Sequence, residues 1–374
     1  MENVVYILGA GFSAPRGLPV MKNFFDKAQE LVNTDEKRFE RMRDVIEQIY
    51  TTSSAGDNFS YDKFNIEEAL SLLDIRDILT GGHLRKELED FVIDVILKCT
   101  PLVPDLPELD VGWKDQLFGA DELQRGYLSF VASLNHLSVR VMNYSDHGDE
   151  RLMAEFDRPT DDSIRYDVIT LNYDTLLEDA CEYLNKYNSA VPLKVFRPGK
   201  KQITLAFGDG LGEGRSLADP AANGNPLLLK IHGCAKRRDI ILPTMIKGLG
   251  HAEIPPSWKI AFRILERATQ IRILGYSLPE TDAYIKDLLR SSTANSKSIS
   301  AIDVVCLDDG TVREKYDRFM KHRNYRFAPA NVREYMRLVY ALRDEDMESK
   351  LVTFQGLEKA HDDIMKTHLK ERHN

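Results

Sequence analysis

The chain has 374 residues, enough for about two and a half average domains, or for one large domain with an insertion. Its 50 Lys and Arg against 59 Asp and Glu give a net charge of −9, which argues against a general attraction to nucleic acid or anionic membranes. Its 43% hydrophobic content is that of a globular protein, and no apolar run approaches the roughly 20 residues of a membrane-spanning helix.

The cysteines point to a reducing compartment. Cys99, Cys181, Cys234 and Cys306 lie far apart and form no Cys-x-x-Cys pair, so neither a zinc ribbon nor a thioredoxin-type motif is present. The first apolar run begins at Val4 with no basic leader before it, so we expect no signal peptide. We therefore expect a cytoplasmic protein with reduced thiols.

The chain begins with the pattern of a strand, a glycine turn and a helix. Residues 4–8 are continuously apolar and rich in β-branched side chains, as in a strand buried on both faces of a parallel sheet. After the glycine turn, Pro19 suits a first helical turn, and a helical stripe of apolar residues follows at Met21, Phe24, Phe25 and Ala28.

Helical patterns dominate from about residue 35 to about 160. The run Asn65-Ile66-Glu67-Glu68 has the form of a helix N-cap, and residues 122–143 also read as helical. Because about 125 residues far exceed what one crossover needs, we expect a helical insertion at about 35–160.

Strands and helices then alternate. Four further strands are predicted, at 168–171, 227–231, 271–274 and 302–307, and the charged tail, 311–374, is predicted to be a helical segment. This alternation predicts an α/β protein with a Rossmann-like, doubly wound parallel sheet in one domain at 1–310. Ligands of such sheets bind beyond the carboxyl ends of the strands.

The first strand is followed by Gly9-Ala10-Gly11-Phe12-Ser13-Ala14, a Gly-x-Gly-x-x-Ala turn. Such a turn lets the backbone approach a pyrophosphate at the start of a helix, although glycines can also simply tighten a turn. No second strand ends in an acidic residue about 20 residues later, which disfavours an ordinary nicotinamide dehydrogenase.

Polar residues follow the other predicted strands. Asn172 and Asp174 follow the second strand, where Asp174 could merely cap a helix; His232 follows the third. The last two strands are followed by Gly275-Tyr276-Ser277 and by Asp308, and Asp282 is a further candidate that could equally cap a helix. Each is an ordinary turn residue alone, but together they predict one crevice beside a phosphate-binding loop.

In this order, the motifs resemble those of the sirtuin superfamily. Gly9-Ala10-Gly11-x-Ser13 with Gly17-Leu18-Pro19 is similar to the family's Gly-Ala-Gly-x-Ser and Gly-Ile-Pro, at the same spacing. Three more motifs are similar to its Thr-Gln-Asn-Ile-Asp, His-Gly and Gly-Thr-Ser: Thr170-Leu171-Asn172-Tyr173-Asp174, His232-Gly233 and Gly275-Tyr276-Ser277.

The chain departs from the sirtuin deacylases in three places. Val20-Met21-Lys22 stands where they have Asp-Phe-Arg, and Leu171 stands where they have Gln. Their four-cysteine zinc module has no counterpart, because the 42 residues between His232 and Gly275 contain one cysteine. The chain instead resembles bacterial sirtuin-like proteins of antiphage defence, of Thoeris-type systems and of systems with a ring ATPase, in its Asn-Tyr-Asp motif, its helix at Asn65-Ile66-Glu67 and its run at 275–282.

This resemblance implies an NAD glycohydrolase that releases nicotinamide and ADP-ribose without a metal, as the effector of an abortive-infection defence. Asn172 would hold the nicotinamide ribose and the attacking water, and His232 would accept a proton. The implied residues for binding NAD are Gly9, Ala10, Gly11, Phe12, Ser13, Pro19, Asp174, Gly275, Tyr276, Ser277 and Asp308.

Two other functions stay open: an NAD-dependent protein deacylase or ADP-ribosyltransferase, and a noncatalytic NAD-sensing subunit of an assembly with a ring ATPase. We expect a homo-oligomer, with a partner ATPase or a phage-derived activator possible and with no membrane partner. Direct nucleic-acid binding is not expected, although Lys236-Arg237-Arg238 and Arg197 with Lys200-Lys201 form local basic clusters.

Overall fold

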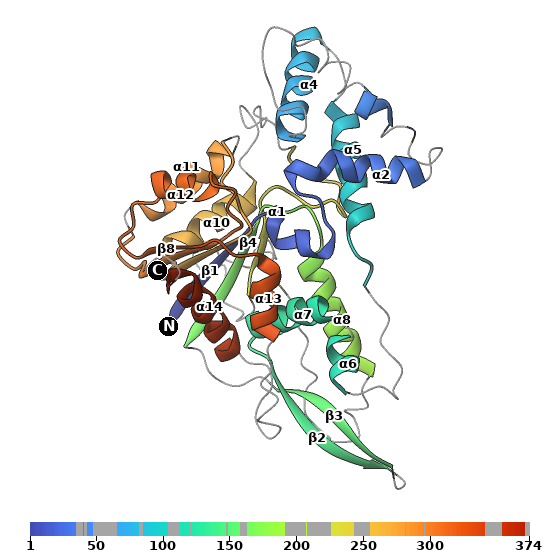
Figure 1. The fold of residues 1–374 in the computed structure, drawn as a ribbon, viewed down its shortest axis with the longest axis vertical. Helices are drawn as coiled ribbons and strands as arrows, with labels where there is room; N and C mark the ends of the chain where they lie inside the picture. Colours follow the sequence, from blue (N-terminus) through green and yellow to red (C-terminus); the bar gives the residue numbers. More distant parts are fainter. Residues whose placement is uncertain are drawn as a thin grey trace.

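A parallel six-stranded sheet forms the centre of the protein (Figure 1). The computed structural model describes residues 1–34, 40, 43–47, 66–81, 85–103, 113–119, 121–146, 149–157, 163–190, 207, 226–242, 255–280, 282–294, 296–340 and 354–370. The strands are β1 (Glu2–Leu8), β4 (Ile164–Thr170), β5 (Leu228–Lys230), β6 (Gln270–Leu274), β7 (Ala301–Val305) and β8 (Tyr325–Ala328). All five strands predicted from the sequence are therefore confirmed.

The strand order, β5-β4-β1-β6-β7-β8, is that of a doubly wound Rossmann-type sheet. The chain moves outward from β1 to β4 and β5 on one side, then crosses back to β6 and continues to β7 and β8 on the other. The order reverses between β1 and β6, and this switch point is where such sheets place their ligands. The predicted fold class is confirmed.

Helices cover both faces of the sheet, because β1 alternates its side chains between two apolar layers. Tyr6 and Leu8 pack into the layer formed with α7 (Glu122–Leu134), α8 (Leu176–Ala190), α13 (Val332–Tyr340) and α14 (Phe354–Lys370). Val5 and Ile7 pack into the layer formed with α10 (Pro256–Glu266), α11 (Ala283–Thr293) and α12 (Val312–Phe319).

A third apolar cluster lies beyond the carboxyl edge of the sheet and is drawn at the top of Figure 1. It joins α2 (Phe24–Thr34), α4 (Ile66–Thr80) and α5 (Arg85–Cys99). Between β1 and α2 lie the short α1 (Ala10–Ser13) and two 3-10 turns, Ala14–Arg16 and Met21–Asn23, so the turn after Pro19 is not yet α-helical. The expected N-cap Asn65 lies outside the described residues.

The expected helix at 122–143 is wrong beyond Leu134. After α7, His136 adopts a left-handed φ of 54°, which ends the helix. A hairpin of β2 (Ser138–Asp146) and β3 (Asp149–Asp157) follows and projects from the body at the bottom of Figure 1, near α6 (Trp113–Phe118). The insertion is thus not purely helical, and residues 138–141 alternate polar and apolar side chains with the period of a strand.

The expected boundary at residue 310 is also wrong for the sheet. β8 lies within the tail that was predicted to be helical, and it pairs in parallel with β7. It places Arg326 beside Asp303 of β7, with two hydrogen bonds of 2.7 and 2.6 Å to the carboxylate. The tail is therefore part of the same folded body.

A buried chain of hydrogen bonds attaches α14 to the sheet. Arg272 donates to the Tyr6 hydroxyl at 2.9 Å, the hydroxyls of Tyr6 and Tyr335 lie 3.3 Å apart, and Tyr335 lies 3.3 Å from His361 Nδ1. His361 Nε2 lies 2.9 Å from the Asp303 carboxylate. Burial lowers the pKa of His361 to about 4, so a neutral ring accepts from Tyr335 and donates to Asp303.

Candidate functional site

The loops that follow the carboxyl ends of the strands meet at one edge of the sheet. In register, Leu8 pairs with both Thr170 and Leu274, and Thr170 pairs with Lys230. Gly9, Asn172, His232 and Gly275 therefore follow their strands at the same level. The structure brings these four predicted site residues to a common edge.

The first loop and the loop after β6 pack backbone against backbone. The amide of Gly11 donates to the carbonyl of Gly275 at 2.8 Å, and that of Gly9 donates to Leu274 at 3.1 Å. A Cβ at Gly9 would lie 2.6 Å from the Cα of Tyr276, and a Cβ at Gly11 would lie 2.8 Å from the Gly275 oxygen. Glycine is needed at positions 9 and 11 for this contact between two loops.

Gly275 is constrained even more tightly. Its φ is 64°, in the left-handed region, and a Cβ there would lie 2.2 Å from the amide nitrogen of Phe12. The glycines of both motifs are therefore needed for the same contact, because a side chain in either loop would keep the two loops apart at the switch point.

Asn172 joins the second motif to the first. Its Nδ2 group donates to the Gly9 carbonyl at 2.9 Å and to Ser13 Oγ at 3.0 Å. A carbonyl oxygen can only accept, so the amide orientation is fixed, and the side chain is 9% exposed. Both Nδ2 protons serve the glycine loop, and a ligand would meet Asn172 through Oδ1.

Two of the predicted ligand-binding side chains point into the core instead. The Phe12 ring is 1% exposed and packs edge-on against Tyr127 at 5.3 Å. Tyr276 is 5% exposed, and its hydroxyl donates to Asp282 at 3.0 Å. Any contact of Phe12 or Tyr276 with a ligand would therefore be through the backbone, and Asp282 serves as the internal partner of Tyr276.

The acidic candidates make helix-start contacts. The Asp174 carboxylate accepts from the amide of Leu176 at 3.0 Å, at the start of α8, and its carbonyl accepts from Lys230 Nζ. Asp308 accepts from the amides of Gly310 and Arg313 at 3.0 and 3.3 Å, at the start of α12. These contacts match the helix-capping alternative, and they leave the second carboxylate oxygen of each for other partners.

His232 lies near two aromatic rings. The Tyr173 and Trp258 ring centroids are 6.4 and 6.5 Å from the imidazole, at interplanar angles of 36° and 39°. Tyr173 donates from its hydroxyl to the carbonyl of Ile241 at 2.7 Å, and its carbonyl accepts from the amide of Ala235 at 2.9 Å. The loop that carries His232, residues 231–241, is thereby attached to the loop that carries Asn172.

Trp258 was missed by the sequence reasoning. It lies on α10, and its Nε1 donates to the carbonyl of Ile231, directly before His232, at 2.8 Å. No motif contains it, and its only sequence signal is that it is one of two tryptophans in the chain.

Two residues with strained backbone conformations lie in the loops that carry His232 and Ser277. Two of the three non-glycine residues with positive φ in the described part of the chain are Arg238, at 56°, and Leu278, at 53°. They follow His232 and Ser277 in their loops. Such conformations cost free energy and concentrate at functional sites. Of the remaining candidates, Pro19 is buried, and Ala10 and Ser277 are half-buried.

The described basic cluster pairs within the protein. Arg238 contacts Asp90 and Asp94 of α5 at 2.7 and 3.2 Å, and Arg237 contacts Asp239 at 2.9 Å. The other predicted cluster, Arg197 with Lys200 and Lys201, lies outside the described residues.

The cysteines are not assembled into a metal centre in the described residues, which hold no group of three or more His, Cys, Asp or Glu side chains placed to bind a metal. Burial raises the pKa of the Cys181 and Cys306 thiols to about 12, so both are protonated at neutral pH. Within the same described part, no helix combines the length and apolar character that a bilayer crossing requires.

Comparison with known families identifies one domain. Residues 167–328 match the family described as SIR2-like domain, a span that runs from within β4 to the end of β8 and is less than half of the chain. The span contains Asn172, His232 and Gly275, whereas the first glycine loop precedes it. This part of the chain is thus similar to the family whose motifs the sequence resembles.

Two further comparisons add little. No curated protein matches the sequence. Among solved structures, the chain is similar to a crystal structure of SIR2 in complex with the inhibitor EX-527, 2'-O-acetyl-ADP-ribose and a deacetylated p53 peptide. The identity is 12%, the match covers 89% of this chain and 90% of that chain, and the TM-score is 0.32, too low to carry an argument.

Proposed function

We propose that the protein hydrolyses NAD to nicotinamide and ADP-ribose at the edge formed by β5, β4, β1 and β6. The observation that carries this proposal is the pair of hydrogen bonds from Asn172 to Gly9 and Ser13, next along the chain to Tyr173, whose ring lies 6.4 Å from His232. They join two motifs typical of NAD-dependent sirtuin-like proteins at the switch point of a Rossmann-type sheet. The match of residues 167–328 to the SIR2-like domain supports the same substrate.

For this reaction the protein has to position NAD and a water molecule and to accept one proton. Cleavage of the bond between nicotinamide and ribose passes through an oxocarbenium-like state, and the leaving nicotinamide is already positively charged in NAD. Asn172 Oδ1 would accept a hydrogen bond from the attacking water or a ribose hydroxyl. His232 would take the proton that the water loses as its oxygen bonds to the ribose carbon. Nicotinamide leaves with the electron pair of the broken bond.

The remaining candidates would bind the rest of NAD. The backbone of residues 9–13, with Pro19 nearby, would lie against the pyrophosphate, and Asp174 would add a polar contact from the neighbouring loop. On the other side of the switch point, Gly275, Tyr276 and Ser277 would meet the adenosine, with Asp308 bonding its ribose hydroxyls. These assignments follow from the resemblance and from the shared edge of the sheet.

We also propose the biological setting implied by the resemblance to the zinc-lacking, antiphage branch of sirtuin-like proteins. The protein would act in the cytoplasm as a homo-oligomer, with a ring ATPase or a phage-derived activator as its trigger, and its depletion of NAD would halt the infected cell. NAD measured in phage-infected cells that express the protein should fall, and it should stay constant with Asn172→Ala.

The direct test is an assay of purified protein with NAD, with nicotinamide and ADP-ribose quantified by chromatography. Asn172→Ala and His232→Ala should each lose at least about 100-fold in kcat, the usual loss for a catalytic acid or base, while circular dichroism stays unchanged. Lys297→Gln, a surface change remote from the site, is the matched control. Full activity in both site variants would refute the assignment, and nicotinamide release only with an acyl-lysine peptide would favour a deacylase.

A further inference from the structure

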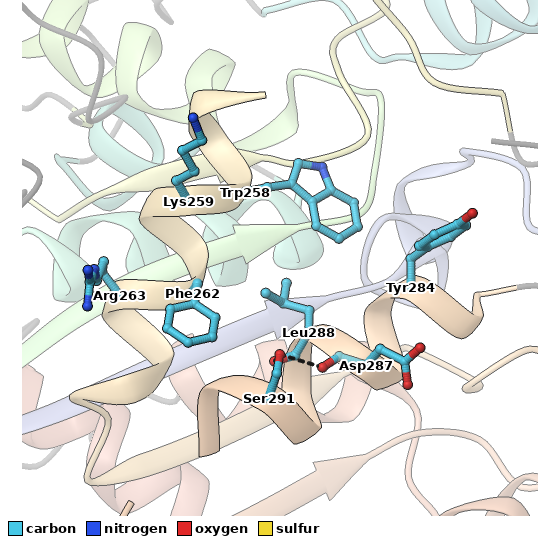
Figure 2. A pocket seen from close by; sticks show the side chains of 8 residues that line it. All are labelled: Trp258, Lys259, Phe262, Arg263, Tyr284, Asp287, Leu288 and Ser291. Atoms are coloured by element: carbon cyan, nitrogen blue, oxygen red, sulfur yellow. Dashed lines mark hydrogen bonds between the residues drawn. The ribbon is translucent and has the colours of Figure 1, made fainter. Parts of the chain in front are cut away.

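A hollow lies between α10 and α11, outside the loops of the candidate site (Figure 2). Its volume is about 530 Å³, within the range of pockets that hold small molecules. Its apolar lining includes Trp258 and Phe262 from α10 and Tyr284 and Leu288 from α11. Figure 2 shows the rings of Trp258 and Tyr284 on either side of its upper end. We call this hollow the α10–α11 groove.

The lining favours a flat ring as occupant. Three aromatic side chains border the groove: Trp258, Phe262 and Tyr284. Tyr284 is 39% exposed, whereas Ile285 and Leu288 of the same helix are buried. Aromatic faces bind planar heterocycles by stacking, at a small conformational cost to either partner.

The charges on the rim favour an anionic group on that ring. Arg263 is paired with Glu266 at 3.1 Å, and Asp287 is paired with Arg290 at 3.2 Å. Lys259 also borders the groove and makes no ion pair with any residue in the described ranges. One cation beside an aromatic groove is complementary to a ring that carries a phosphate.

Trp258 belongs both to the groove and to the surroundings of His232. Its ring lines the groove, its Nε1 holds the carbonyl of Ile231 at 2.8 Å, and its centroid lies 6.5 Å from the imidazole of His232. A ligand that displaces the Trp258 ring must therefore change the position of His232 or of the backbone before it.

We propose that the α10–α11 groove is a second binding site for an anionic heteroaromatic molecule of the mononucleotide class, and that Trp258 transmits its occupancy to His232. The ligand ring would stack between Trp258 and Tyr284, and its phosphate would reach Lys259. The transmission step rests on the proposed function of His232, whereas the binding step does not.

The chain offers a specific reporter, because Trp113 and Trp258 are its two tryptophans. In a Trp113→Phe background, fluorescence excited where adenine does not absorb reports on Trp258 alone. AMP, used as the probe, should change this fluorescence saturably at micromolar to millimolar concentrations. Adenosine should bind more weakly, and ribose 5-phosphate should give no change in the same range, since it lacks the ring.

Variants in the same background locate the signal. Tyr284→Ala should weaken AMP binding about tenfold, and Lys259→Gln should weaken it about fivefold, toward the affinity of adenosine, as expected for one stacking contact and one solvent-facing charge. Lys297→Gln is the matched control and should change nothing. Asp308→Ala should leave the AMP signal intact, which separates the groove from the adenosine end of the proposed NAD site.

The transmission step has its own readout. AMP should alter kcat for NAD hydrolysis in the parent protein and should no longer do so in Tyr284→Ala, whose activity without AMP should equal the parent's. No saturable AMP signal, a signal indifferent to Tyr284→Ala, or one lost in Asp308→Ala would overturn the groove as a nucleotide site. Absence of NAD hydrolysis would refute the proposed function instead, and the fluorescence titration would still decide the groove.

Discussion

Asn172 Nδ2 donates to the carbonyl oxygen of Gly9 at 2.9 Å, across 163 positions of sequence. The bond is buried, and it holds the amide in the one orientation that directs Oδ1 away from the glycine loop. The residue that the resemblance assigns to the reaction is therefore also a structural link between the loops after β1 and β4. Substitutions at this position should separate the two roles.

Asn172→Asp should remove the link as well as the activity. A carboxylate cannot donate to Gly9 and would face its carbonyl oxygen, so we expect a loss of about 2 kcal/mol in the free energy of unfolding. Asn172→Ala should lose about 1 kcal/mol, since it removes one donor group without adding a charge. Urea denaturation of both variants measures the difference, and equal stability of the two would contradict this reading of the contact.

Gly275→Ala should be among the most destabilising single substitutions in the protein. The added Cβ would lie 2.2 Å from the Phe12 nitrogen at a φ of 64°, so steric overlap and backbone strain both apply. We expect a loss of about 4 kcal/mol or more. Gly310→Ala is the matched control, because its φ of 91° carries the strain while nothing lies within 4 Å of the added carbon. A loss of about 1–2 kcal/mol there, measured by thermal unfolding, would isolate the contribution of the close contact.

Glu358→Gln should destabilise the attachment of α14 to the sheet. Glu358 accepts from Arg272 at 2.8 and 2.5 Å and from Tyr166 at 2.7 Å, and the Arg272 side chain is 3% exposed. Without its carboxylate partner, the buried guanidinium should cost about 3 kcal/mol. Replacing both ends of the pair, by Arg272→Met with Glu358→Leu, should recover most of that loss.

The matched control for this prediction is Glu314→Gln. It breaks an ion pair with Arg318 in which both side chains are exposed, and such pairs contribute less than about 0.5 kcal/mol. If Glu358→Gln costs no more than this control in chemical denaturation, the buried pair does not stabilise α14.

The contribution of His361 should lower the stability of the protein as the pH drops below 6.5. Burial lowers the pKa of His361 to about 4, so between pH 6.5 and pH 4 the unfolded state binds a proton that the folded state does not. This stabilises the unfolded state by about 2 kcal/mol at pH 5. Asp167 acts in the opposite direction, because burial raises its pKa to about 6 and the folded state takes up a proton there.

A variant isolates the contribution of His361. Glutamine can donate to Asp303 and accept from Tyr335 but does not titrate. His361→Gln should therefore raise the free energy of unfolding at pH 5, relative to that at pH 7.5, by about 2 kcal/mol compared with the parent protein. The measurement is urea denaturation at both pH values, with His322→Gln as the control outside this network. An unchanged difference would show that His361 is not held neutral.

The sequence patterns predict most of the sheet and the order of the site motifs. Five strands were found because each is a short, mainly apolar run with at least one β-branched residue, and the parallel order follows from the intervening helices. β8 was missed because Tyr325–Ala328 contains no β-branched residue and carries Arg326, so it lacks the pattern of a buried strand. The hairpin at 138–157 was missed because polar and apolar residues alternate only over 138–141, and the helical pattern before it was extended through it.

The site could be predicted as a set of loops but not as a set of contacts. Positions 9 and 11 need glycine because the backbone at Gly275 packs against them. This contact forms only once β1 and β6 have paired, so no local sequence pattern predicts it. Likewise, Trp258 reaches His232 through the placement of α10, and no local pattern encodes that placement. Phe12 and Tyr276 lie inside motifs yet face the core, because which side chains of a loop face inward is decided by the layers packed around it.

The central position of β1 has a consequence for biosynthesis. The strand Glu2–Leu8 pairs with residues 164–170 and 270–274, so during synthesis the middle of the sheet cannot close until residue 274 has been made. Both edges of this apolar strand are unpaired until β4 has been made, and one edge stays unpaired until β6 follows, so the strand has to be kept from associating with other chains. We therefore expect soluble yield to depend on synthesis speed and chaperone supply more steeply than the stability of the finished protein would suggest.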